Sequence, residues 1–147
     1  MDIIAPTYEV RQAGKFVYII PGEVVAWKRV NPGKGSYRAY DDQKRAKTAI
    51  GHQIQNQHGS RPLYKGILHA EFQFFMPIPL NLHKRKDLIA GTLYPTKPDF
   101  NDLVKLIVDV CQGILYENDS CIASALIQRR YDDGQGLRTQ FYFQEVK

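Results

Sequence analysis

The feature that most constrains the fold is a helix, predicted from about Asn101 to Leu115, that is apolar over most of its circumference. At about 3.6 residues per turn, its large aliphatic side chains fall on one face and smaller apolar side chains widen that face. Such a helix must lie against other elements. One narrow polar stripe remains, formed by Asp102, Lys105, Asp109 and Gln112.

Alternation of apolar and polar residues predicts a strand with one buried face at Leu68–Met76. Turn signals and β-branched or aromatic runs predict further strands at Phe16–Ile20, Val24–Val30, Ile122–Tyr131 and Leu137–Val146. We expect the last two strands to form a hairpin over the turn at residues 132–136. A second helix is predicted at Asp42–His58, and the segment Pro77–Pro98 is expected to be irregular.

The predicted order β-β-α-β-α-β-β indicates an α+β fold, a mixed β-sheet with two main helices packed on it. A length of 147 residues favours a single domain over residues 1–147. No apolar run is long enough to span a bilayer and the N-terminus does not resemble a signal peptide, so we expect no membrane partner. Cys111 and Cys121 suit neither a zinc site nor a redox pair, and we expect reduced thiols in a cytoplasmic protein.

A net charge of +5 is compatible with a polyanionic partner, and the distribution of the charge is more informative than its size. The acidic side chains gather between Asp99 and Asp119, whereas cations cluster elsewhere. For any single cation, a merely solvated loop is the more common explanation. Our candidates for phosphate contacts with DNA are Lys28, Arg29, Lys34, Arg38, Lys84, Arg85 and Lys86.

Asp99, Asp102 and Asp119 are candidate ligands for Mg²⁺, which prefers oxygen donors and supports phosphodiester hydrolysis. Lys105, one turn beyond Asp102, could stabilise developing phosphorane charge or orient the attacking water. A structural interpretation competes with this one. Asp99 and Asp102 also suit a helix N-cap and its third position, and spacing alone favours this interpretation. Asp109 is expected to be structural, holding Lys105 or a backbone group.

The segments Lys97–Lys105, Gly113–Tyr116 and Asn118–Ile122, with Asp109 between them, resemble the RusA-type Holliday-junction resolvases. The family pattern runs Lys-Pro-Asp-x-Asp-Asn-Leu-x-Lys, then Asp, and later Asp-Asp-x-x-Ile or Val. An early segment, residues 20–25, is similar to the family's opening strand and turn. The resemblance extends from about Phe16 to the last predicted strand.

The resemblance implies a homodimeric, magnesium-dependent endonuclease of phage or prophage origin that nicks four-way DNA junctions symmetrically, with Mn²⁺ as a substitute metal. Two nicks related by a two-fold axis suit two active sites related in the same way. By position, Asp99 and Asp119 correspond to the first and last essential aspartates of the family. Lys105 corresponds to the essential lysine.

The chain departs from the family pattern in the middle of the motif. The second aspartate of the family falls on Asn101, and the asparagine that should follow falls on Asp102. Either residue could supply the middle metal ligand, Asn101 through its carbonyl oxygen or Asp102 through its carboxylate. Asn118 likewise stands where the family has an acid.

These departures leave two hypotheses beside the resolvase. One is a non-catalytic protein that binds branched DNA through a degenerate metal site. The other is a structural phage protein with a basic surface.

Overall fold

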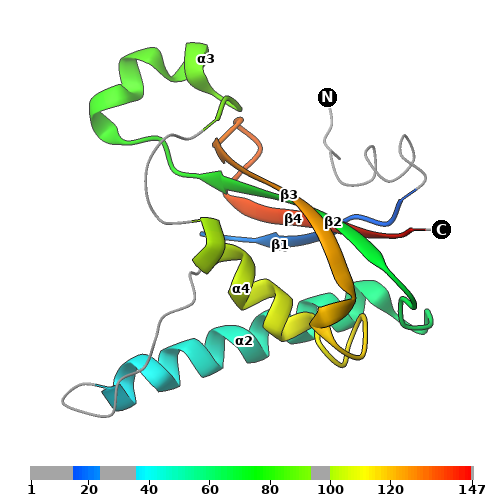
Figure 1. Ribbon diagram of the computed structural model, residues 1–147. Helices are drawn as coiled ribbons and strands as arrows, with labels where there is room; N and C mark the ends of the chain where they lie inside the picture. The colour runs from blue at the N-terminus through cyan, green and yellow to red at the C-terminus, as the bar shows by residue number, and fades with distance from the viewer. Residues whose placement is uncertain (1–14, 24–35, 94–99, 147) are drawn as a thin grey trace.

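The computed structural model describes residues 15–23, 36–93 and 100–146, and its α+β architecture agrees with the predicted fold class (Figure 1). A mixed four-stranded sheet carries the two long helices on one face. In chain order the elements are β1 (Tyr18–Pro21), α2 (Ser36–His58), β2 (Leu68–Met76), η1 (Leu80–Arg85), α3 (Lys86–Ile89), α4 (Phe100–Cys111), η2 (Asp119–Cys121), β3 (Ile122–Tyr131) and β4 (Arg138–Glu145).

The bounds of β2 and β3 are those predicted, but three other expectations need correction. Helix α2 begins at Ser36 rather than Asp42. The segment expected to be irregular contains the short helices η1 and α3. Helix α4 ends at Cys111 rather than Leu115, because Gly113 adopts a φ of +88° and the amide of Leu115 turns back to the Cys111 carbonyl (2.8 Å). The predicted strand at 24–30 lies outside the described residues.

The sheet has the strand order β1-β4-β2-β3, with β2 parallel to β3 and antiparallel to β4. The predicted hairpin between the last two strands is therefore wrong, since β2 lies between them. The connection between β3 and β4 crosses the end of β2, where the Asp132 amide donates to the Met76 carbonyl (2.8 Å). Burial explains this arrangement. Strand β2 is buried along most of its length, and two neighbouring strands pair both of its edges. Residues 123–126 of β3 are exposed, which suits a strand at the edge of the sheet.

The hydrophobic core lies between the sheet and helices α2 and α4. Phe72 of β2 stacks on Phe141 of β4, with ring centroids 5.6 Å apart. Leu103 and Leu106 of α4 and Ile54 of α2 are completely buried against these strands. The apolar face predicted for α4 is thus confirmed as the face that meets the core. Among the described residues, no helix is both long and apolar enough to cross a membrane.

Both cysteines are free thiols, as expected. Cys111 is completely buried at the end of α4, and burial raises the pKa of its thiol. This cysteine therefore acts as a small apolar packing group. Cys121 is partly exposed at the end of η2.

Candidate active site

The polar stripe predicted on α4 faces away from the core. Lys105 and Gln112 are exposed, and Asp102 and Asp109 are partly exposed. We call these four residues the polar edge of α4. A single helix thus packs its apolar face into the core and presents a row of charged side chains at the opposite side.

Asp109 lies between the helices rather than at an open site. Its Oδ2 is 3.9 Å from Nζ of Lys47 on α2, and both side chains are about one third exposed. A partly exposed ion pair of this kind contributes little to stability, roughly 0–1 kcal/mol. The expectation of a structural role for Asp109 is consistent with this contact. The sequence does not predict that Lys47 lies beside Asp109, because a contact between two helices leaves no signal in the spacing of residues along either helix.

Asp119 begins η2 and is held at the C-terminal end of α4. Its backbone amide donates to Oε1 of Gln112 (3.0 Å). The side chain of the preceding residue, Asn118, accepts from the Ser120 amide (2.9 Å) and so caps η2. Gln112 therefore positions the turn that carries Asp119, a role that sequence reasoning missed. The side-chain carboxamide of Asn118 also holds this turn, through its bond from the Ser120 amide.

Asp102 and Asp119 lie at opposite ends of α4. Asp102 is in the first turn, and Cys111, the last residue of α4, lies nine positions further along the helix. At a rise of about 1.5 Å per residue, this corresponds to about 13 Å along the helix axis. Ligands of one Mg²⁺ ion must each approach it to about 2.1 Å. An axial separation of this size argues against one ion being held by both carboxylates of the same chain.

The other candidate ligands are Asn101 and Asp99. Asn101 is exposed in the first turn of α4, beside Asp102, and Asp99 precedes the helix outside the described residues. Carboxylate and amide oxygens are the donors that Mg²⁺ prefers, so the chemistry of the donor set fits this ion. In the part of the chain that the structure describes, no group of three His, Cys, Asp or Glu side chains could hold a metal ion.

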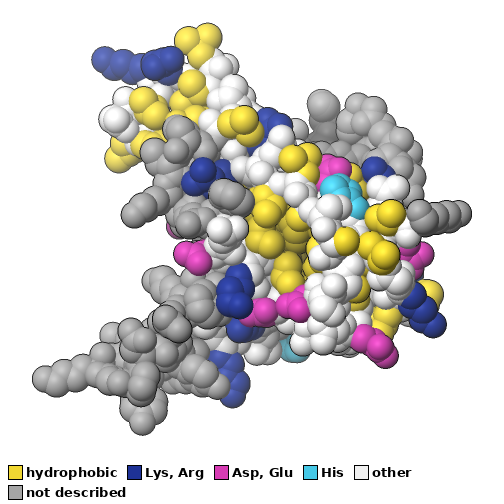
Figure 2. All heavy atoms as spheres, in the orientation of Figure 1, with side chains coloured by type: hydrophobic (Ala, Val, Ile, Leu, Met, Phe, Trp, Pro, Cys, Tyr) yellow, Lys and Arg dark blue, Asp and Glu magenta, His cyan; other side chains and the backbone are white. Residues whose placement is uncertain are grey.

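The predicted DNA contacts divide into two groups. Lys84, Arg85 and Lys86 are exposed side by side on η1 and α3, where Figure 2 shows cations beside apolar side chains on a projecting part of the molecule. The others cannot be placed as side chains. Arg38 lies in the first turn of α2, where only the backbone is described, and Lys28, Arg29 and Lys34 lie outside the described residues.

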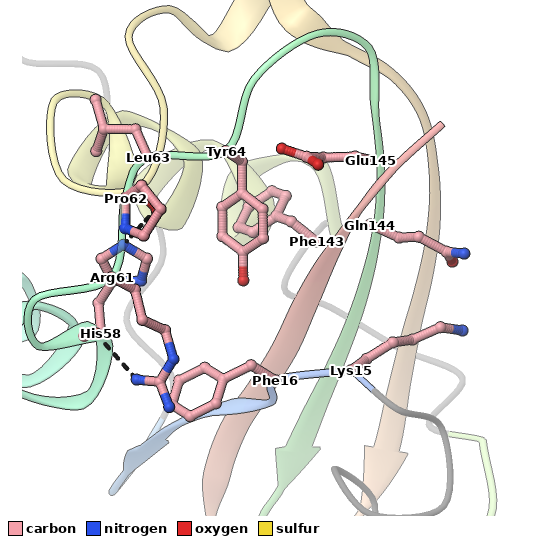
Figure 3. Close-up of a pocket in the computed structure, with 10 residues that line it drawn as sticks. All are labelled: Lys15, Phe16, His58, Arg61, Pro62, Leu63, Tyr64, Phe143, Gln144 and Glu145. Atoms are coloured by element: carbon pink, nitrogen blue, oxygen red, sulfur yellow. Dashed lines mark hydrogen bonds between the residues drawn. The ribbon is translucent and has the colours of Figure 1, made fainter. Parts of the chain in front are cut away.

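A hollow of about 520 Å³ opens where the C-terminal end of α2 meets β1 and β4 (Figure 3). Its wall is held by hydrogen bonds that are buried or partly buried. His58 Nε2 donates to the Pro62 carbonyl (3.1 Å), Tyr18 Oη lies 2.7 Å from His58 Nδ1, and Tyr64 Oη lies 3.1 Å from Tyr18 Oη. Burial raises the pKa of both tyrosines, which therefore stay neutral. None of the predicted site residues that the structure describes lines this hollow.

A second hollow, of about 420 Å³, adjoins the turn that carries Asp119. It shares Leu63 and Tyr64 with the first and is also lined by Asn118, Ser120 and Cys121. The surface beside Asp119 is therefore concave, with polar groups on the side of the turn.

Comparison with known proteins identifies a family. The family model described as Endodeoxyribonuclease RusA matches residues 21–140, which include α4, η2 and the whole of β2 and β3. No curated protein matches the chain.

Proposed function

Because the chain belongs to the RusA endodeoxyribonuclease family, we propose that it is a magnesium-dependent endonuclease that resolves Holliday junctions and related branched DNA by paired nicks. The observation that carries this proposal is the polar edge of α4, with Asp102 and Lys105 outward and the core behind them. A nuclease needs carboxylates and a cation held rigidly beside an accessible surface, and the buried face of α4 supplies the rigidity.

In this proposal the metal ligands are Asp99, Asp102 and Asp119, with the carbonyl oxygen of Asn101 as an alternative to Asp102 in the middle position. When bound, Mg²⁺ polarises the phosphate and lowers the pKa of a water molecule, and Mn²⁺ can substitute for it. Lys105 places a positive charge one turn along α4 from Asp102, where it can stabilise the negative charge that develops on the phosphate.

The active enzyme is proposed to be a homodimer in which each site draws on both chains. The axial separation of about 13 Å between the ends of α4 supports this arrangement. Asp102 of one chain would approach Asp119 of the partner subunit, and the two-fold axis would generate a second, identical site. Two such sites suit paired nicks in a four-way junction, whose strands are themselves related by symmetry.

Lys84, Arg85 and Lys86, together with the basic residues before and within the start of α2, are proposed to contact phosphates. Such contacts supply affinity for any DNA and depend steeply on salt. The selection of branched DNA then depends on the shape of the junction and on the spacing of the two sites.

One observation favours a second candidate. Asn101 stands where the family pattern has an aspartate, which removes a negative charge from that position. The second candidate is therefore a non-catalytic branched-DNA binding protein with a degenerate metal site.

The test uses a four-way junction labelled on one strand at a time, incubated with the protein in Mg²⁺ or in a chelator. We expect nicks only with Mg²⁺ and at symmetric positions in opposite strands. The variant Asp119→Asn should lose nicking and keep junction binding, measured by gel shift. The matched control is Asp109→Asn, which removes the same charge near the same end of α4 and should still cut.

Junction binding without Mg²⁺-dependent nicking would support the non-catalytic candidate instead. Full nicking by Asp119→Asn would show that the metal assignment is wrong. Loss of nicking by both variants would show that nicking depends on the negative charge at this end of α4 rather than on Asp119 as a specific metal ligand.

A further inference from the structure

The two most exposed large hydrophobic side chains among the described residues lie close together in the chain. Leu80 of η1 is 85% exposed and Leu88 of α3 is 77% exposed. We call the segment Leu80–Ile89 the arm. In Figure 1 the arm stands away from the sheet and from the two long helices, and in Figure 2 its surface is a mixture of apolar and cationic side chains. Apolar side chains gathered on a projecting surface, rather than scattered singly, indicate a site of contact with a partner.

The arm is firmly attached to the sheet at both ends. Before it, the Met76 carbonyl accepts from the Asp132 amide (2.8 Å). After it, the Gly91 amide donates to the Tyr131 carbonyl (3.1 Å), and Nη1 of Arg130 donates to the Gly91 carbonyl (2.6 Å). These bonds join the base of the arm to the ends of β2 and β3. The arm is therefore a preorganised projection, able to apply its side chains to a partner at little ordering cost.

The charges on the arm indicate which partner it fits. Lys84, Arg85 and Lys86 are exposed between the two leucines, and Asp87 is the single acid in the arm. If the arms of two copies packed against each other, the three cations of each arm would meet a single acid on the other, which is unfavourable. DNA provides both complements, because phosphates pair with the cations and the faces of unstacked bases cover the leucines.

The arm also lies within reach of the proposed active site. Seven residues lead from Leu93, just beyond the arm, to Phe100 at the start of α4. A chain of this length spans at most about 25 Å. Because a DNA strand rises about 3.4 Å per nucleotide, the base of the arm lies within roughly seven nucleotides of the start of α4. A branch point and a scissile phosphate can be separated by such a distance.

We propose that the arm is a wedge that enters the branch point of the DNA substrate, with Leu80 and Leu88 against unstacked bases and Lys84, Arg85 and Lys86 on the flanking phosphates. This inference rests on the proposed function, since it requires branched DNA as the substrate. It adds to that function a specific device for recognising the branch, separate from the metal-binding carboxylates.

The test is a fluorescence measurement on four-way junctions that carry 2-aminopurine either at the branch point or in the middle of one arm of the DNA. Binding is measured with Ca²⁺ in place of Mg²⁺, so the readout does not depend on cutting. The wild-type protein should raise the fluorescence at the branch point, where bases unstack, and leave the mid-arm probe unchanged. The variant L80A/L88A should lose most of the rise, and its preference for junction over duplex should fall about tenfold.

Two controls separate the wedge from other effects. I67A/V146A removes two exposed apolar side chains at the opposite end of β2 and should behave as the wild type. The oligomeric state of L80A/L88A is measured by sedimentation and should equal that of the wild type. A monomeric L80A/L88A, beside an oligomeric wild type, would show instead that the leucines pack against a second copy of the chain.

An undiminished signal in L80A/L88A, or a wild-type protein that binds the junction without any signal at the branch point, would overturn the wedge and leave the proposed nuclease intact. A wild-type protein that does not bind junctions at all would overturn both.

Discussion

Mixing Asp102→Asn protein with Asp119→Asn protein should restore cutting that neither variant shows alone. In the proposed homodimer, each variant lacks one proposed ligand at both sites. In a mixed dimer, however, one site combines the two substituted residues, and the other combines the two intact carboxylates. We expect this outcome because Asp102 lies about 13 Å along the helix axis from the end of α4 that holds the Asp119 turn, a separation that favours ligands from two chains at one ion.

The expected recovery can be worked out from the arrangement. Equal amounts of two freely exchanging subunits give about half mixed dimers, and each mixed dimer has one intact site of two. About a quarter of the wild-type sites are therefore restored in the unfractionated mixture, and about half in purified mixed dimers. Because the intact sites occur singly, nicked junctions should accumulate rather than resolved duplexes. The product distribution is thus as informative as the rate.

The assay uses co-expressed chains with two different affinity tags, so that mixed dimers are purified by two successive columns. Nicks in a labelled junction are then quantified with saturating Mg²⁺. As a control, Asp102→Asn paired with a chain carrying both substitutions should stay inactive, because no site in that dimer has both carboxylates. An inactive mixed dimer, beside an active wild-type dimer with the same two tags, would refute the shared site and the geometric reasoning behind it.

Three further predictions concern single substitutions. Asn101→Asp should lower the Mg²⁺ concentration needed for half-maximal nicking by several-fold, whereas Asp102→Asn should raise it or abolish nicking; an unchanged requirement in both would place the middle ligand elsewhere. Asp133→Asn should lower the free energy of unfolding by about 2 kcal/mol at pH 7, because Asp133 accepts two hydrogen bonds of 3.0 Å from Arg138. Burial raises the pKa of this carboxyl, but the hydrogen bonds from Arg138 and from the Gln135 amide, together with the charge of Arg138, outweigh burial and hold the pKa below its usual range. The difference in the free energy of unfolding between the two proteins should therefore shrink as the pH falls below about 4, which urea unfolding at several pH values measures. Gly51→Ala should raise the free energy of unfolding by about 1 kcal/mol, because alanine favours the helical conformation more than glycine does. The added Cβ would lie 3.5 Å from Cγ1 of Val110 on α4, an ordinary van der Waals contact. A lower Tm of the variant would show that the methyl group does not fit between the helices.

The parts of the fold that the sequence predicts well are those set by local periodicity. The bounds of β2 follow from its alternation of buried and partly exposed side chains. The orientation of α4 follows from its single polar stripe. In both cases the pattern repeats within a few residues, so each element indicates its own buried face without information about its neighbours.

The parts that could not be predicted depend on contacts between distant segments. The turn at residues 132–136 is typical of a hairpin, yet β2 lies between β3 and β4, because turn residues set the reversal of the chain and burial sets which strands pair. The contact of Gln112 with the Asp119 amide and the approach of Lys47 to Asp109 are likewise invisible to spacing. For the site, the predicted helix already places Asp102 near its start and Asp119 beyond its end, and the fold adds that the Asp119 turn is held at the end of α4.

The geometry of α4 also gives physical meaning to the inverted pair Asn101-Asp102. Successive helical residues differ by about 100° around the axis, so the inversion keeps one carboxylate and one amide but turns the carboxylate by that angle. Position 101 lies about 20° from Gln112, the residue that holds the Asp119 turn, and position 102 lies about 20° from Asp109, which faces Lys47. The carboxylate of this chain therefore lies on the same line of the polar edge as Asp109, rather than on the line that leads to Gln112 and the Asp119 turn. The pair carries the same charge as the family motif, but its carboxylate points in a different direction from the helix. The direction would matter for a bound Mg²⁺ ion, because this ion requires ligands close to octahedral positions.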